Sequence, residues 1–166
     1  MSRIASITVA LLLCAAMANA NAAEVHWRVK AKLEDAAKDC AKYGGTLRTP
    51  DDRTVRLIDV NDDGHDDYVI DYRYFRCEGK PNVFCSSDGF CMVEFLGWVS
   101  DNEWKGFLVA DVADWRVRKG DKPALLLLQR QFCNRPKEPK CTMVYTFRNG
   151  TMSGKIRDAK YFKTAK

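Results

Sequence analysis

Hydrophobic and polar positions alternate with a helical period soon after residue 24. Apolar side chains fall on one stripe and charged side chains occupy the other faces; the stripe consists of Val29, Leu33, Ala36, Ala37 and Cys40. A spacing of about 3.6 residues is typical of an amphipathic helix. Gly44 and Gly45 follow, and glycine readily adopts the left-handed conformation that ends a helix. We therefore expect one helix near the N-terminus that ends at this glycine pair.

From Thr54 onward the pattern changes to short runs that are rich in β-branched and aromatic residues, with turn-forming residues between them. The expected strands span residues 54–59, 68–75, 92–100, 104–109, 115–118, 124–131, 142–148 and 152–157, and the tail 158–166 is expected to be frayed. Asn149-Gly150 suits a two-residue hairpin turn, because both positions need positive φ. The sequence predicts a mainly β protein with one N-terminal helix (α+β), whose antiparallel sheet is curled or forms a small sandwich.

The first 23 residues differ from the rest of the chain. Arg3 precedes an almost wholly apolar run from Ile4 to Met17, and small residues continue to Ala23. This order is typical of a secretory signal peptide, and the run is shorter than the roughly 20 residues that a membrane-spanning helix needs. We expect a signal peptide over residues 1–20, with cleavage after Ala23 as the alternative, and a single globular domain over residues 21–166. The mature chain is then periplasmic or secreted and has no transmembrane segment.

Cysteine usage agrees with export. Cys14 falls within the signal peptide, which leaves six cysteines: Cys40, Cys77, Cys85, Cys91, Cys133 and Cys141. An even number in an exported chain indicates disulfides, although six cysteines allow 15 pairings. Proximity in sequence favours Cys133–Cys141 and Cys85–Cys91, which leaves Cys40 for Cys77. Zinc is the competing use of clustered cysteines, but no C-x-x-C pair occurs.

The sharpest chemical feature is an acidic loop from Asp59 to Asp67. With Asp59 as position 1, oxygen-bearing side chains stand at positions 1, 3, 5 and 9, glycine at position 6, and a backbone carbonyl is available at position 7. Calcium takes six to eight oxygen ligands, and a tight loop can supply them from alternate residues. The predicted ligands of one structural calcium ion are Asp59, Asn61, Asp63, the carbonyl of His65, and Asp67.

An alternative is a loop that closes through side-chain hydrogen bonds without metal, since Asp, Asn and Gly are ordinary turn formers. Five carboxylates lie within these nine residues, however: Asp59, Asp62, Asp63, Asp66 and Asp67. Gathering them without a cation would cost electrostatic repulsion that a plain turn does not require. The charge density therefore favours calcium.

The loop departs from an EF-hand, because position 12 is Ile70 where an EF-hand has glutamate, and a strand follows where an EF-hand has a helix. The run D-x-N-x-D-G-x-x-D, within residues 57–71, resembles the calcium loop of FG-GAP/VCBS-type repeats. That resemblance implies a hairpin loop in which Asp67 supplies the last carboxylate. Asp62 replaces the usual small residue, and a single copy excludes a full propeller. The whole layout resembles small exported bacterial proteins that pair such a loop with closely spaced cysteines.

Charge and aromatic residues limit the classes of function that are expected. The formal net charge is +5, but no dense basic run with interleaved aromatics occurs, so nucleic-acid binding is not expected. Neither His26 nor His65 stands beside a nucleophile in the sequence. Carboxylates in the strand region remain candidates for catalysis: Glu94, Glu103 and Asp111. Most aromatic residues of the strands are expected in the core, and Trp98, Trp104 and Trp115 are the candidates for an exposed binding surface instead.

These observations favour a binding module for another protein or a cell-envelope component, such as an inhibitor or accessory protein. Two other hypotheses stay open. One is a small cell-envelope enzyme that uses carboxylates on a sheet face, and the other is a structural envelope protein with no ligand but the metal.

Overall fold

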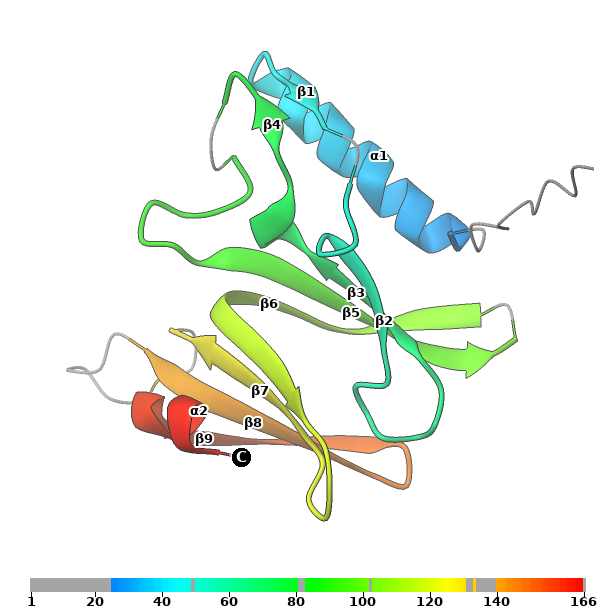
Figure 1. The fold of residues 1–166 in the computed structure, drawn as a ribbon, viewed down its shortest axis with the longest axis vertical. Coiled ribbons are helices and arrows are strands. Elements are labelled where there is room, and N and C mark those ends of the chain that lie inside the picture. The colour runs from blue at the N-terminus through cyan, green and yellow to red at the C-terminus, as the bar shows by residue number, and fades with distance from the viewer. Residues whose placement is uncertain are drawn as a thin grey trace, which may run out of the picture.

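The computed structural model describes residues 25–48, 50–80, 83–101, 103–130, 133 and 140–165, so the expected signal peptide and its cleavage site lie outside the described residues. The elements are α1 (Trp27–Lys42), β1 (Thr46–Leu47), β2 (Val55–Ile58), β3 (Asp67–Asp71), the 3-10 helix η1 (Tyr72–Tyr74), β4 (Cys77–Glu78), β5 (Cys91–Ser100), β6 (Glu103–Arg118), β7 (Ala124–Gln129), β8 (Cys141–Arg148), β9 (Thr151–Asp158) and α2 (Ala159–Thr164). The expected class, mainly β and antiparallel with an N-terminal helix, is confirmed (Figure 1).

Strand β6 gives the sheet its curvature. Within the described residues, seven strands pair in the order β2-β3-β5-β6-β7-β8-β9, and β1 and β4 form a separate two-stranded sheet. The first part of β6 pairs with β5 and the last part with β7, with a register shift between Val112 and Asp114. Such irregularities bend a strand and increase its twist. The sheet is curled as expected, but the two strands expected over residues 104–109 and 115–118 belong to one continuous strand (Figure 1).

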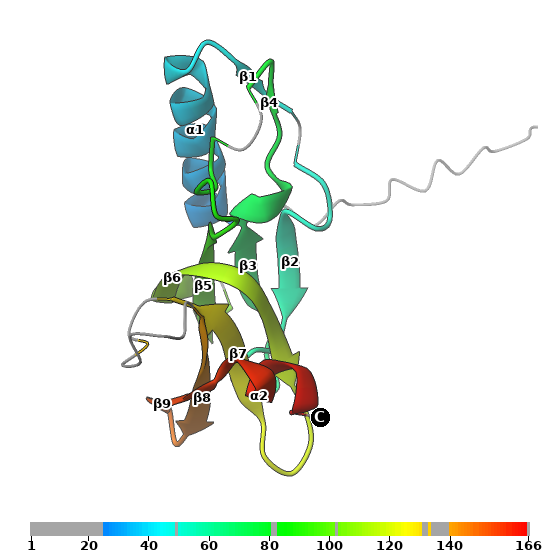
Figure 2. The same cartoon turned by 90° about the vertical axis from the view of Figure 1, so that its left-hand side faces the viewer.

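Both faces of the sheet carry apolar cores, because successive residues of a strand point to opposite faces. One core gathers side chains from across the sheet, including Val69, Phe95, Val112, Leu125 and Leu127. On the other face, α1 packs against β3 and β5, and α2 packs against β7 and β8. The two helices lie at opposite ends of the molecule (Figure 2).

Two segments differ from the sequence expectation. The strand expected over residues 68–75 ends at Asp71, whose side chain accepts a hydrogen bond from the Arg73 N–H and starts η1. The tail expected to be frayed contains α2, which Asp158 caps by accepting from the Tyr161 N–H. Phe162 of α2 is 7% exposed and packs on the sheet. Burial of this ring, together with hydrogen bonds from Arg116 to the Phe162 and Ala165 carbonyls, holds the tail on the sheet.

Three disulfides join the described cysteines in the pairs that sequence proximity favoured: Cys40–Cys77, Cys85–Cys91 and Cys133–Cys141. They indicate an oxidising compartment. Cys40–Cys77 ties α1 to β4. A Cβ at Gly45 would come within 2.5 Å of the Cys77 Sγ, so close packing against this disulfide requires glycine at position 45. In the part of the chain described, no helix is long and apolar enough to cross a membrane.

Candidate functional site

The acidic loop lies between β2 and β3, and its own side chains close it. The Asp59 carboxylate accepts hydrogen bonds from the N–H groups of Asp62, Asp63 and Gly64. Asn61 accepts from the Asp63 N–H and donates its amide to the Asp63 carboxylate at 2.8 Å. Positive φ values of 62° at Asp62 and 88° at Gly64 allow the chain to turn this tightly. Three of the predicted calcium ligands therefore gather within one turn.

Asp67 begins β3 and is fully buried. Its two oxygens accept from the N–H groups of Trp98 and Val60, each at 2.9 Å. Burial raises the pKa of the Asp67 carboxyl, and the nearby charges of Asp63 and Asp59 raise it further, against the opposing effect of the two N–H donors. No ion pair among the described residues involves Asp67. A raised carboxyl pKa means that the ionised form opposes folding at neutral pH.

The donor chemistry of this loop fits a calcium ion. Asp59, Asn61 and Asp63 offer carboxylate and amide oxygens, and each Asp67 oxygen retains accepting capacity beyond its single hydrogen bond. Among the described residues, no three His, Cys, Asp or Glu side chains already converge on one point, so an ion would draw carboxylates away from the loop N–H groups. Lys119 Nζ, 3.6 Å from an Asp59 oxygen, offsets part of the loop charge.

The β5–β6 hairpin contacts the acidic loop through two aromatic side chains. The His65 ring stacks on Trp98 with ring centroids 3.5 Å apart and the planes inclined by 10°. Trp104 Nε1 donates to the Asp66 carbonyl at 3.1 Å. The loop is therefore held to the sheet by two of the three tryptophans that the sequence offered as candidates for a binding surface.

The three candidate tryptophans do not share one surface. Trp115 is 6% exposed, belongs to the core and donates its Nε1–H to Asp71. Trp104 packs edge-on against Tyr68, beneath the start of α1. Trp98 alone among these three lines the groove that adjoins the acidic loop. Trp115 is therefore a core residue, as expected for most aromatic residues of the strands.

The aromatic groove, as we name it, lies where the acidic loop, the β5–β6 hairpin and the β8–β9 hairpin meet, and has a volume of about 590 Å³. Its apolar lining comes from Trp98, Val99, Phe107, Phe147 and Met152, and its charged rim from Asp62, Asp63, Lys105 and Arg148. The Phe107 and Phe147 rings meet edge to face at 5.9 Å. A concave, apolar site with a few charged groups at its rim has the size and composition of a ligand pocket.

Sequence reasoning missed most of this groove. Phe147 and Met152 are opposite each other across the β8–β9 hairpin, whereas Phe107 belongs to β6, and the curl of the sheet brings it to the other two. The Asn149-Gly150 signal correctly predicted the hairpin turn, with φ values of 50° and 72°. It carried no information on what the hairpin faces.

Glu94 is the carboxylate best suited to the enzyme hypothesis, being 6% exposed. It accepts hydrogen bonds from the Lys32 ammonium at 3.1 Å and the Tyr72 hydroxyl at 3.2 Å, and it borders a second cavity of about 600 Å³. The described residues that line this cavity include no other carboxylate; Glu103 and Asp111 are exposed on β6 outside it. Two-carboxylate hydrolysis needs a facing pair, so this geometry does not favour it.

No protein-family profile, curated protein or solved structure matches the chain.

Proposed function

We propose that this chain is an exported binding protein, periplasmic or secreted, that takes a segment of a partner protein into the aromatic groove. The observation that carries the proposal is the composition of that groove, with its apolar floor and a rim bearing both signs of charge. Interfaces combine an apolar centre with a polar rim in this way. The signal-like N-terminus and the three disulfides support export.

Calcium has a structural role in this proposal. Asn61, Asp62 and Asp63 belong to the acidic loop and also border the aromatic groove. An ion held by Asp59, Asn61, Asp63, Asp67 and the His65 carbonyl would offset the charge of the buried Asp67 carboxylate and fix the wall of the groove. Partner binding is then expected to weaken when calcium is removed.

Val99→Arg is expected to weaken binding of the partner, because Val99 lines the aromatic groove and is 49% exposed, so an arginine there obstructs the groove without disturbing the core. The matched control is Val109→Arg on β6, where the valine is 58% exposed and lies outside the groove. The measurement is affinity capture from cell-envelope extract and culture fluid on immobilised mature protein with calcium, followed by titration of the purified partner against each variant.

We expect the partner to bind wild type and Val109→Arg with similar affinity and to bind Val99→Arg about tenfold more weakly or worse. A partner that binds Val99→Arg as tightly as wild type would show that the aromatic groove is not its site. The proposal is equally contradicted if no captured protein binds wild type and Val109→Arg more tightly than Val99→Arg.

A further inference from the structure

A second concave surface, which we call the basic groove, lies on the outer face of β8 and β9 beside α2. Its volume is about 620 Å³. Five cationic side chains line it, namely Arg118, Lys122, Arg148, Lys155 and Arg157, against a single acidic residue among the described lining residues, Asp121. The strand geometry explains why two of these cationic side chains lie together, because Lys155 and Arg157 are two residues apart on β9 and so share one face of the sheet.

Within the described residues, the cations of the basic groove have no ion-pair partners. None of its five cations forms an ion pair with a carboxylate in the described part of the chain, whereas arginines elsewhere, such as Arg53 and Arg73, pair with aspartates. Neutral groups orient two of the five instead. Arg118 donates to the Lys122 carbonyl and the Tyr161 hydroxyl, and the Arg157 guanidinium lies over the Tyr161 ring at 5.9 Å. Like charges gathered in a concavity attract and concentrate anions.

Two hydroxyl groups line the basic groove together with these cations. Thr146 of β8 and Ser153 of β9 are directly opposite in the strand register, their side-chain oxygens are 3.0 Å apart, and both residues line the groove. The site thus offers ammonium and guanidinium groups for carboxylate or phosphate, together with neutral donors and acceptors for hydroxyl groups.

We propose that the basic groove binds an acidic glycan, a chain of sugars that carries carboxylate or phosphate groups. Its anionic groups would pair with Lys155, Arg157 and Arg118, and its sugar hydroxyls would bond to Thr146 and Ser153. This site is separate from the aromatic groove, although Arg148 and Phe147 border both.

Two other anionic partners fit the groove less well. Single-stranded nucleic acid needs exposed aromatic rings on which bases stack. Of the two rings among the described lining residues, Tyr161 already faces Arg157 and accepts from Arg118, and Phe147 packs edge to face against Phe107. A membrane surface favours apolar side chains beside the cations, but the exposed Ile156 points to the opposite face of β9 from Lys155. A soluble glycan needs neither feature.

The test titrates a galacturonate oligomer into the mature protein and into the double variant Lys155→Glu/Arg157→Glu. Both residues are exposed, so the fold should be retained, which circular dichroism checks. The control is Lys38→Glu/Lys80→Glu, which makes the same change in net charge at exposed positions outside the groove. We expect saturable binding to wild type that weakens with salt, a loss of about tenfold or more in the groove variant, and a loss of less than about threefold in the control.

Parallel titrations use neutral dextran, a thymidine oligonucleotide and phosphatidylglycerol vesicles. The proposal is overturned if the galacturonate oligomer does not bind, if both double variants lose affinity equally, or if the oligonucleotide or the vesicles bind the groove more tightly than the glycan. Because the substitutions lie outside the lining of the aromatic groove, capture of the protein partner should be unchanged in the Lys155→Glu/Arg157→Glu variant. The two proposals can therefore fail independently.

Discussion

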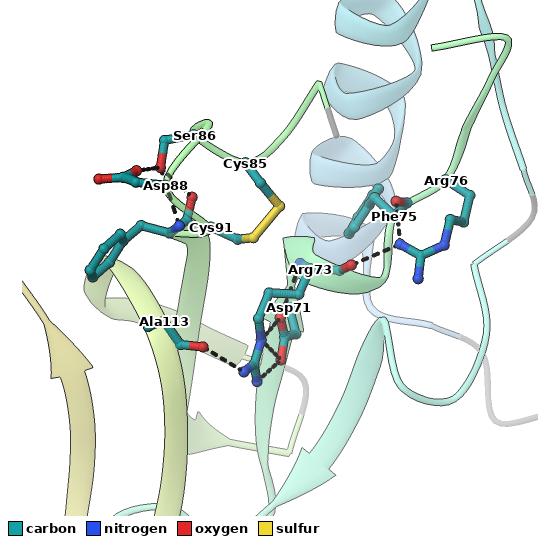
Figure 3. The surroundings of a disulfide bond; sticks show 10 residues. Asp71, Arg73, Phe75, Arg76, Cys85, Ser86, Asp88, Cys91 and Ala113 are labelled. Atoms are coloured by element: carbon teal, nitrogen blue, oxygen red, sulfur yellow. Dashed lines mark hydrogen bonds and ion pairs between the residues drawn. A yellow bond between two sulfur atoms is a disulfide. The ribbon is translucent and has the colours of Figure 1, made fainter. Parts of the chain in front are cut away.

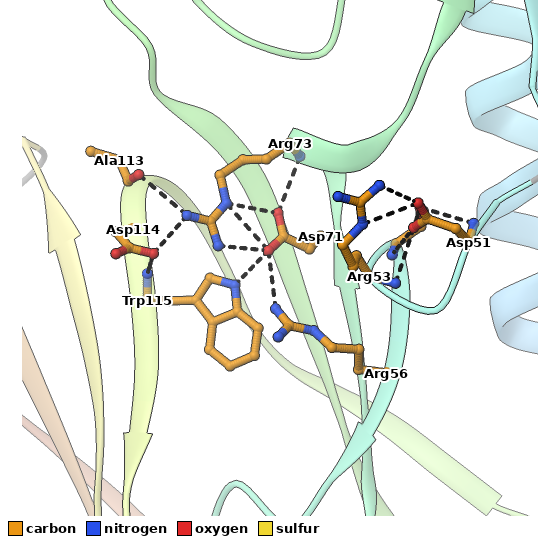
Figure 4. Close-up of polar contacts among 9 residues, drawn as sticks. Asp51, Arg53, Arg56, Asp71, Arg73, Ala113, Asp114 and Trp115 are labelled. Carbon is orange, nitrogen blue, oxygen red and sulfur yellow. Dashed lines mark hydrogen bonds and ion pairs between the residues drawn. The ribbon is translucent and has the colours of Figure 1, made fainter.

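Asp71→Ala is expected to lower the free energy of unfolding by about 3–5 kcal/mol, the largest effect of any single substitution considered for this protein. Asp71 is fully buried and accepts hydrogen bonds from Arg73 at 2.7 Å, Arg56 at 3.3 Å and Trp115 Nε1 at 2.7 Å (Figure 4). Removing the carboxylate leaves the Arg56 guanidinium, whose side chain is 32% exposed, without its carboxylate partner among the described residues, and leaves Arg73, 18% exposed, with only the exposed Asp114. Uncompensated charge in such a place costs more than the lost contacts themselves.

The matched control is Asp114→Ala. Asp114 accepts from the same Arg73 guanidinium at 2.7 Å, but its side chain is 51% exposed, so we expect a loss of about 1 kcal/mol or less. Burial alone would lower the pKa of Arg73, but its hydrogen bonds with Asp71 and Asp114 outweigh burial and raise the pKa, which keeps the guanidinium charged. Urea denaturation of both variants measures the difference. Equal losses would show that burial of Asp71 is not the source of its effect.

Replacing Cys40 and Cys77 together by alanine is expected to cost roughly 4 kcal/mol, because a cross-link that spans 37 residues removes much of the loop-closure entropy of the unfolded chain. The same replacement of Cys85 and Cys91, which are separated by 6 residues, is expected to cost only roughly 2 kcal/mol. The shorter disulfide joins the loop before β5 to that strand, beside Asp71 and Arg73 (Figure 3).

Urea denaturation of the two double variants under oxidising conditions provides the measurement, with the remaining disulfides verified by mass spectrometry. A larger loss for the Cys85–Cys91 pair than for the Cys40–Cys77 pair would contradict the loop-closure explanation. It would mean instead that local packing around the shorter disulfide determines stability.

Local patterns in the sequence were sufficient to predict much of the fold. The apolar stripe from Val29 to Cys40 correctly predicted α1, since a helix buries residues at a regular spacing. Proximity in sequence was sufficient to predict the three disulfide pairs. The continuity of β6 was not predictable, because Asp111 and Asp114 interrupt its apolar pattern. Asp114 pairs with Arg73, a residue distant in sequence.

The candidate site was predictable only in part. The acidic loop is visible as a short run of Asp, Asn and Gly, because all its proposed ligands lie within nine residues. The aromatic groove and the basic groove depend on the curl of the sheet and on the β8–β9 register, which bring together side chains without any local signature. The burial of Trp115 likewise follows from its pairing across the sheet with Leu127.

Calorimetric titration of calcium into the metal-free mature protein determines whether the acidic loop binds one calcium ion. Asp63→Asn removes one proposed ligand charge. Asp62→Asn is the matched control, since it removes the same charge from the same loop at a non-ligand position whose φ of 62° asparagine tolerates.

We predict one site in wild type with a dissociation constant of roughly 10⁻⁴–10⁻³ M, the range of extracellular modules. Asp62→Asn should retain this affinity within about threefold, and Asp63→Asn should lose about tenfold or more. The absence of saturable calcium binding to wild type, or an equal loss of calcium affinity in the two variants, would contradict calcium binding by the acidic loop.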